Sequence, residues 1–321
     1  MARSELSVVT VGLRGTDPLA PTLRALAAQS IADQLEIVVV LPEGVPAPSP
    51  EGFAAVRTVR LPQLITTGGA IAAGVHAATA PIVAYVEEHS WPRPSWAERL
   101  LAAHGSGVGA VSWSLENANP SSATSWVSLL TDFGRAVHPA PSPPVWPPPW
   151  HHTSYRRELL IAYGSGLAAV LEAEWRLHAD LPAGGHRFEH AGDARSRHWN
   201  VSRYGAHLQS ELRGARSFGA SRVEHGGWGP ARRLGYAVAA PLVWALRVRR
   251  SVPDLRRVAP PRIAMVAPLL CAGLVSAAAG EAWGYVGGPG SSRRLRMRVE
   301  LDRRPSLGRA DRARWDRAVE V

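Results

Sequence analysis

The N-terminal part of the chain alternates apolar runs with amphipathic segments. Leu6 to Val11, Leu35 to Val40 and Ile82 to Val86 are short runs rich in Val and Ile, which is typical of buried strands. Between them, Pro18 to Gln29 repeats its leucines at helical spacing, and Gly68 to Ala78 has the composition of a small-residue helix. Repeated strand–helix–strand units predict an α/β fold with a parallel sheet and right-handed crossovers.

The third apolar run stops abruptly on Glu87, Glu88 and His89. Open α/β sheets bind their ligands at the carboxyl ends of the strands, so three side chains able to bind a metal at that place indicate a site. The alternative is a core strand that runs into a solvated turn. The repeated units around this segment favour the site.

Several segments together resemble one known enzyme family. Ser7 to Val11, Pro21 to Gln29, Glu36 to Val40 and Ala70 to Ala78 match, in order, the first strand, helix, strand and small-residue helix of the family 2 glycosyltransferases. In that family the next strand ends in an Asp-x-Asp metal motif, and Glu87-Glu88-His89 occupies its place. The turn and helix that follow the motif are matched by the segment from Trp91 to His104.

The resemblance continues into the second half of the chain. Matching segments lie at Tyr155–Leu160, Glu172–Leu177, Gly185–Arg187 and Asp193–His198. The resemblance therefore implies the GT-A fold, an α/β fold with a mostly parallel sheet flanked by helices, over residues 1–200.

A member of this family would move a sugar from a nucleotide-diphosphate donor to a hydroxyl acceptor, with inversion and with the help of Mn²⁺ or Mg²⁺. In register with Asp-x-Asp, Glu87 would lie near the ribose or the water shell of the metal, and His89 would bind the metal directly. His198, at the matching C-terminal position, could supply a further nitrogen. The alternative for His198 is an ordinary surface or hydrogen-bonded core histidine, because the chain has 12 of them.

The reaction also needs a carboxylate that removes the proton of the acceptor hydroxyl. The resemblance places Glu174 on the Asp of the family's Glu-Asp pair and makes it the expected base. Glu172, two residues earlier, is the reserve candidate. A solvated helix face is the open alternative for both carboxylates.

Other positions depart from the family's pattern. Glu43 stands in Leu41-Pro42-Glu43-Gly44, where the family has an Asp-Asp-Gly-Ser turn for the nucleobase, so Glu43, Glu87 and Glu88 are the expected donor-binding residues. Ile71 and Ala72 replace an Arg-Asn pair. These changes leave open a non-catalytic, membrane-associated scaffold that kept the fold and lost its donor contacts.

Composition narrows the choice of partners. The formal charge is +10, and every basic side chain is Arg, which pairs with phosphates of ligands, nucleic acids or anionic membranes. No basic platform interleaved with aromatic residues supports nucleic-acid binding, so we expect no nucleic-acid partner.

A single cysteine, Cys271, excludes an intramolecular disulfide and a cysteine-rich zinc site. A strand-like start without an apolar leader predicts a cytoplasmic protein.

A proline-rich segment separates the two halves of the expected transferase domain. Pro139 to Trp150 has seven prolines and two tryptophans in twelve residues, which predicts a stiff, polyproline-like loop. It could serve as a lid or acceptor wall, or as a rigid connector. His151, His152 and Tyr155 follow at once and could line the same cleft.

The C-terminal third carries two further apolar stretches, Leu234 to Leu246 and Ile263 to Val286, with arginines beside both. The first is short for a membrane span and the second contains Glu281, so residues 201–290 predict interfacial helices at the inner face of the cell membrane. Helices packed on the catalytic domain are the alternative. We expect a lipid-linked or cell-envelope glycan as acceptor, and a solvated Arg-rich tail or short amphipathic helix over residues 291–321.

Overall fold

The computed structural model describes residues 4–15, 17–141, 148–149 and 151–320. The chain forms two compact units. Unit 1 comprises Met1–Ala118, Arg135–Trp199 and Arg314–Val321, and unit 2 comprises Asn119–Gly134 and Asn200–Ala313. The functional division at residue 200 that the sequence suggests stays a prediction.

Unit 1 contains an eight-stranded sheet in the order β3-β2-β1-β4-β7-β6-β8-β5. Its strands are β1 (Leu6–Val11), β2 (Leu35–Pro42), β3 (Ala55–Leu61), β4 (Ile82–Tyr85), β5 (Ser90–Pro92), β6 (Val108–Asn117), β7 (Thr153–Arg156) and β8 (Arg187–His198). Strands β1 to β4 pair in parallel, as do β6 and β8, whereas β7 runs antiparallel to β4 and β6, and β5 runs antiparallel to β8. The predicted α/β class with a largely parallel sheet is confirmed.

The apolar runs of the sequence form the centre of this sheet. All six residues of β1 are buried, which is what a strand covered on both faces requires. The buried carboxylate of Glu36 is the polar exception in β2. It accepts hydrogen bonds from Ser7, from the backbone and hydroxyl of Thr79, and from Arg57, and these bonds hold the pKa of Glu36 below its usual range although burial raises it. Satisfied in this way, the carboxylate ties neighbouring segments together.

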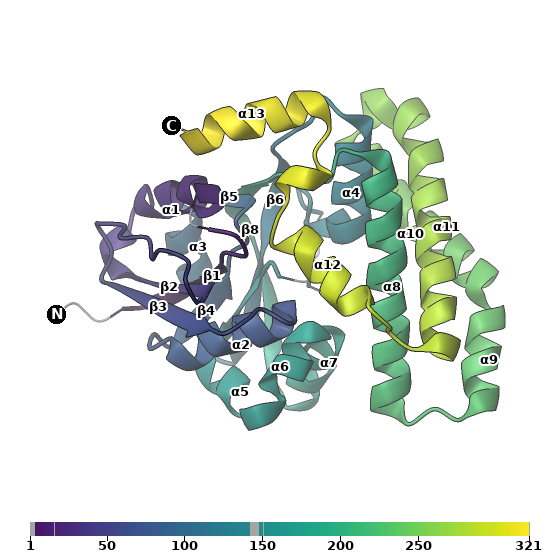
Figure 1. Ribbon diagram of the computed structural model, residues 1–321, viewed down its shortest axis with the longest axis horizontal. Coiled ribbons are helices and arrows are strands. Elements are labelled where there is room, and N and C mark those ends of the chain that lie inside the picture. The colour runs from purple at the N-terminus through teal and green to yellow at the C-terminus, as the bar shows by residue number, and fades with distance from the viewer. Residues whose placement is uncertain (1–3, 16, 142–147, 150, 321) are drawn as a thin grey trace. The chain divides into compact units, whose positions relative to one another are not determined.

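In the described part of unit 1, α-helices flank the sheet (Figure 1). They include α1 (Ala20–Ala27), α2 (Thr67–Ala77), α3 (Trp96–Ala103), α5 (Arg157–Ile161), α6 (Leu167–Glu172) and α7 (Trp175–Ala183). Helix α2 begins at the side-chain cap of Thr66, which accepts the Gly69 N–H. The small residues of α2 allow the helix to pack closely on the sheet. A Cβ at Gly74 would lie only 2.4 Å from Val9 Cγ1 of β1. The helix therefore sits directly on the central strands.

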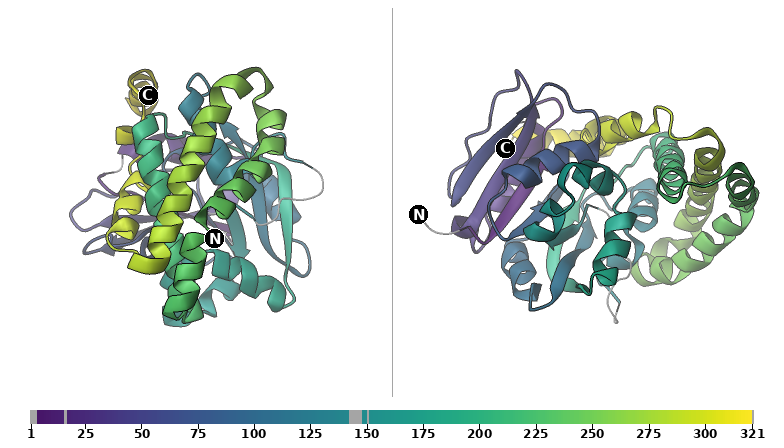
Figure 2. Two further views of the ribbon diagram at one scale, coloured as in Figure 1. Left: turned by 90° about the vertical axis from the view of Figure 1, so that its right-hand side faces the viewer. Right: turned by 90° about the horizontal axis from the view of Figure 1, so that it is seen from below.

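Unit 2 consists of helices in the described residues (Figure 2). They are α4 (Ala123–Phe133), α8 (Tyr204–Gly226), α9 (Pro230–Val238), α10 (Ala240–Val258), α11 (Ile263–Gly287), α12 (Ser292–Glu300) and the start of α13 (Arg309–Glu320). Helices α8 and α11 approach closely, because a Cβ at Gly280 would lie 2.1 Å from the Leu212 carbonyl oxygen. Val127, Leu130, Leu255, Leu270 and Leu274 belong to the buried core that joins α4, α10 and α11.

The C-terminal segments are helical. Among the described residues, one helical stretch, Pro260–Gly287, is long and apolar enough to cross a membrane by length and composition. The last turns of α13 belong to unit 1, where Trp315 is buried and its ring lies 5.8 Å from that of Trp91 and 5.5 Å from that of Trp199. The part of the Arg-rich tail that belongs to unit 1 therefore contributes an aromatic side chain to that unit.

Candidate metal centre

The segment that follows β4 is buried. Glu87 and Glu88 are each 2% exposed, and His89 is fully buried. The backbone N–H of Val86 donates to the Val9 carbonyl oxygen, so the segment leaves the sheet at the carboxyl ends of the parallel strands β1 and β4. Two carboxylates and an imidazole thus lie inside the protein at the sheet edge where α/β folds bind ligands.

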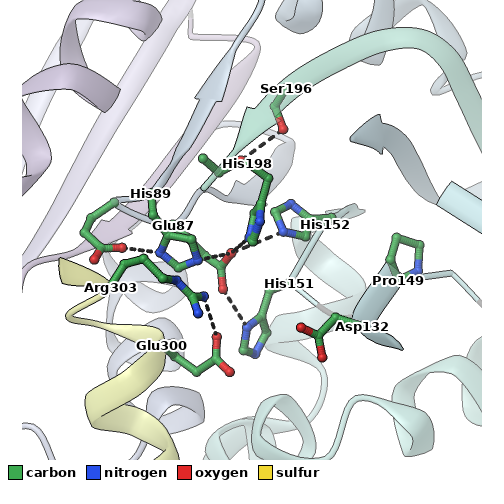
Figure 3. A network of polar contacts seen from close by, with 12 residues as sticks. Glu87, His89, Asp132, Pro149, His151, His152, Ser196, His198, Glu300 and Arg303 are labelled. Carbon is green, nitrogen blue, oxygen red and sulfur yellow. Dashed lines mark hydrogen bonds and ion pairs between the residues drawn. The ribbon is translucent and has the colours of Figure 1, made fainter. Parts of the chain in front are cut away.

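Four histidines surround the Glu87 carboxylate (Figure 3). The Nε2 atoms of His89, His152 and His198 each lie 3.2 Å from Glu87 Oε2. The Nδ1 atom of His151 lies 3.2 Å from the other oxygen, Oε1. One carboxylate therefore gathers imidazoles from three separate segments of the chain.

Strand pairing explains how these segments meet. Strand β7 runs antiparallel to β4, so the two histidines that precede it, His151 and His152, arrive at the carboxyl end of β4. Strand β5 pairs with β8 so that Ser90 lies opposite His198, which places His89 beside His198. The His89 and His198 rings stand edge to face with centroids 4.7 Å apart. The backbone N–H of Trp199 donates to the His89 carbonyl oxygen at 2.9 Å and fixes this junction.

His151 connects two carboxylates. Besides its contact with Glu87, its backbone N–H donates to the Glu174 carboxylate at 3.1 and 3.3 Å, and its Nε2 lies 3.7 Å from Glu174 Oε1. The backbone of His151 has a φ of 60°, a left-handed conformation that non-glycine residues rarely adopt. Such strained residues gather at functional sites, where the surrounding structure holds them in place.

The electrostatics of the cluster favour an ionised Glu87 carboxylate beside neutral His152 and His198. Burial raises the pKa of Glu87, but the charge of His89 and the hydrogen bonds from the other three histidines outweigh burial and hold that pKa well below its usual range. Burial lowers the pKa of His152, and it lowers the pKa of His198 to about 3. Neutral imidazole and ionised carboxylate are the forms that bind metal ions.

Glu88 determines the orientation of the His89 ring. Its Oε2 contacts His89 Nδ1, so the proton at that nitrogen is held by a carboxylate and Nε2 is turned toward Glu87. A carboxylate behind the second ring nitrogen is the usual support of a metal-binding histidine. The candidate metal group of Glu87, His89 and His198 is buried, and its ligand atoms lie within 4.8 Å of one another.

The structure brings some of the residues expected from the sequence together and separates others. Glu87, Glu88, His89 and His198 form the cluster, and Glu174 reaches it through His151. The Glu172 carboxylate instead accepts the backbone N–H of Gly68 at 2.8 Å, at the start of α2. Glu43 is exposed in the turn after β2.

His151 and His152 received no ligand role from the sequence. They follow a proline-rich segment, of which residues 142–147 and 150 lie outside the described residues. The sequence feature that could have indicated a ligand role is the pair of adjacent histidines directly before a short strand. Their role depends on β7 being antiparallel to β4, which no local pattern predicts.

The fold is similar to that of solved glycosyltransferase structures. No family model matches the chain, and no curated protein matches it. Among solved structures, a mannosyltransferase from Pyrobaculum calidifontis in complex with GDP-mannose and Mn²⁺ is similar over 88% of each chain, with 16% identity and a TM-score of 0.53. Glucosyl-3-phosphoglycerate synthase from Mycobacterium tuberculosis is similar over 70% of this chain and 81% of its own, with 18% identity and a TM-score of 0.44. Staphylococcus aureus TarS is similar over 89% of this chain and 55% of its own, with 13% identity and a TM-score of 0.44.

The fold is thus that of the GT-A nucleotide-sugar glycosyltransferases, as the resemblance of the sequence to family 2 implied. The site is a buried carboxylate–histidine cluster at the carboxyl end of the fourth strand.

Proposed function

We propose that this chain is a metal-dependent glycosyltransferase, a divergent relative of family 2, that moves a sugar from a nucleoside diphosphate to a hydroxyl group. The observation that carries the proposal is the convergence of His89, His152 and His198 on the Glu87 carboxylate, each through Nε2 at 3.2 Å. This cluster lies on a GT-A fold at the carboxyl edge of the sheet, where such folds bind ligands. The fold neighbour from Pyrobaculum calidifontis was solved with GDP-mannose and Mn²⁺.

The donor set fits a divalent transition metal. Binding of a metal would require His89 to be neutral, with its remaining proton on Nδ1 facing Glu88 and its Nε2 facing Glu87. The ion would be held by Glu87, His89 and His198, whose ligand atoms lie within 4.8 Å of one another. Because imidazole suits Mn²⁺ and its neighbours better than Mg²⁺, we propose Mn²⁺ rather than Mg²⁺. The bound ion would neutralise the charge that grows on the diphosphate leaving group.

Glu174 is the proposed base. Its side chain is 3% exposed, and the backbone N–H of His151 fixes both of its oxygens. Held in this way, the carboxylate would accept the proton of the acceptor hydroxyl, and the same residue, His151, ties it to Glu87. Glu172 is less suited to this role, because its carboxylate holds the start of α2 through the Gly68 N–H. Inversion at the sugar is part of the proposal and rests on the family resemblance.

Donor contacts beyond the metal differ from the family's pattern. Ile71 and Ala72 on α2 are 3% and 5% exposed and apolar, so they offer no polar group to a diphosphate. This observation favours a second candidate, the non-catalytic scaffold with a retained fold. For the enzyme, we propose that Glu43, in the exposed turn after β2, contacts the nucleobase and that the acceptor is a lipid-linked or cell-envelope glycan at the cytoplasmic face of the membrane.

Release of nucleoside diphosphate from a panel of nucleotide sugars in the presence of Mn²⁺ tests the proposal. The wild-type chain is expected to turn over at least one donor, and His89→Ala to abolish this turnover while the far-ultraviolet circular dichroism stays unchanged. His76→Ala, an exposed histidine of α2 in the same unit, is the matched control and should keep full turnover. Unchanged turnover in His89→Ala contradicts the metal role, and an inactive wild type that binds no nucleotide favours the scaffold.

A further inference from the structure

Helix α11 presents an uninterrupted apolar face to the outside. Exposed residues recur every three or four positions along it, at Met265, Pro268, Ala272, Val275, Ala279, Trp283 and Val286, and the exposed Ala264 and Gly287 adjoin the ends of this series. The opposite face is buried within unit 2, as for Val266, Leu270 and Leu274. A stripe of this spacing covers one side of a helix along its whole length.

The acidic residue of α11 does not interrupt that face. Glu281 is 3% exposed and forms ion pairs with Arg247 at 2.5 Å and with Arg222 at 3.4 Å, and Tyr285 donates a hydrogen bond to it. The charge that makes the sequence of α11 look unsuited to a lipid surface is thus directed inward and compensated. Buried charges are tolerated when they are paired in this way.

Helices α9 and α10, which pack against α11, carry further exposed apolar residues. Leu234, Val238, Leu242 and Leu246 follow one another at intervals of four residues across the junction of the two helices, and they are 60%, 72%, 62% and 37% exposed. The exposed residues Arg249, Arg250 and Arg256 come next on α10. We call these residues, together with the exposed face of α11, the apolar–arginine surface.

The charges of this region are of one sign on the outside. Residues 230–290 contain eight arginines and two acidic residues, Asp254 and Glu281. Both acidic residues are buried and paired with arginines, Asp254 with Arg257 at 2.9 Å. A second copy of the chain would bring like charges together across a symmetric contact, whereas an anionic bilayer complements both the arginines and the apolar side chains.

We propose that the apolar–arginine surface binds the surface of a bilayer that contains anionic lipid, with α11 lying along the interface. Helix α11 has 25 residues, about 37 Å at 1.5 Å per residue, and so is long enough to cross the hydrocarbon core. Its inner face, however, packs against the protein, and glycines bring its backbone against α8. A helix with one face committed to protein and the other apolar, beside exposed arginines, matches an interfacial helix. Binding of this surface to lipid does not require glycosyl transfer.

Co-sedimentation of the full chain with lipid vesicles tests the proposal. Binding is expected to vesicles of phosphatidylcholine that contain about one quarter phosphatidylglycerol, and to be at least tenfold weaker to pure phosphatidylcholine. The combined variant Arg249→Gln, Arg250→Gln and Arg256→Gln should weaken binding to anionic vesicles by about fivefold for each arginine. Arg187→Gln, an exposed arginine of unit 1, is the control and should bind like the wild type.

The apolar part is tested by Leu234→Ser, Val238→Ser and Leu242→Ser combined. These side chains are exposed, so the fold should persist, and binding to anionic vesicles should fall at least tenfold. Ile65→Ser, which changes a 61% exposed apolar residue of unit 1, should have no effect. The proposal is overturned if the folded wild type binds neither kind of vesicle, or if the triple serine variant binds vesicles normally but turns a dimer into a monomer in sedimentation analysis.

Discussion

Glu87 Oε2 lies 3.2 Å from Nε2 of His198, although 111 positions separate the two residues in the sequence. The contact exists because β4 and β8 run in the same direction and end at the same edge of the sheet. Strand β7 lies antiparallel between β4 and β6, and β6 runs parallel to β8. Glu87 and His198 thereby belong to one cluster although they lie far apart in the sequence.

Glu88→Gln should weaken Mn²⁺ binding by about 10- to 100-fold, because the amide no longer holds the proton of His89 Nδ1 as a carboxylate does. Isothermal titration calorimetry with Mn²⁺ alone measures the change without any substrate. Glu158→Gln, an exposed carboxylate of α5, is the control and should bind Mn²⁺ like the wild type. Equal affinity of Glu88→Gln and the wild type would remove Glu88 from the account.

Glu174→Gln should lower kcat by about 10²- to 10⁴-fold, since the amide cannot accept the proton of the acceptor hydroxyl. Binding of Mn²⁺ and of the nucleotide should stay within a factor of a few, because Glu174 is not part of the candidate metal group of Glu87, His89 and His198. Steady-state rates and calorimetry on the same preparation separate the two effects. Activity near the wild-type level would exclude Glu174 as the base and return attention to Glu172.

Gly284→Ala should destabilise unit 2 by about 1–3 kcal/mol, as over-packing of a tight contact does. The added Cβ would lie 2.2 Å from the Arg216 carbonyl oxygen and 2.9 Å from the Ala220 nitrogen, both backbone atoms of α8. Gly235→Ala is the control, because a Cβ there meets nothing within 4 Å inside α9 and should be neutral or slightly stabilising. Urea unfolding of both variants measures the difference, and equal midpoints would argue against close contact of α8 with α11.

Stability should decline as the pH falls from about 6.5 toward 4. Burial lowers the pKa of His104 to about 4, of His178 to about 3 and of His190 to about 4, all from 6.5. Below pH 6.5 the unfolded chain therefore binds protons that the folded chain does not, and the free energy of unfolding falls. His178→Gln keeps an acceptor for the Tyr155 hydroxyl and should reduce this slope by up to about 1.4 kcal/mol per pH unit. An unchanged slope would show that His178 is protonated in the folded state.

The sequence predicted the central strands, because a run of Val and Leu such as Leu6 to Val11 is typical of a buried strand. It also placed Glu87, His89 and His198 in one candidate metal group. The sequence did not predict β3. None of its residues is buried, and Val56 is 38% exposed, so the strand lacks the apolar run that marks β1 and β2. His151 and His152 were not assigned as ligands from the sequence, because their contacts with Glu87 depend on the direction of β7. That direction follows from tertiary packing rather than from a local sequence pattern.

Glu172 shows a second limit of sequence reasoning. Two residues from Glu174, Glu172 was the reserve candidate for the base in the sequence analysis. The chain instead ends α6 at Glu172 and begins α7 at Trp175, so the two side chains serve different segments. Glu172 accepts from Gly68 and Glu174 accepts from His151.

Calorimetric titration with a panel of nucleoside diphosphates, with and without Mn²⁺, tests the central claim most directly. The account predicts that at least one nucleotide binds with a stoichiometry near one only when Mn²⁺ is present, and that His198→Ala loses this binding while His76→Ala keeps it. Absence of nucleotide binding under both conditions, or binding that does not depend on Mn²⁺ and survives His198→Ala, would contradict the claim that the Glu87 cluster holds a metal–diphosphate.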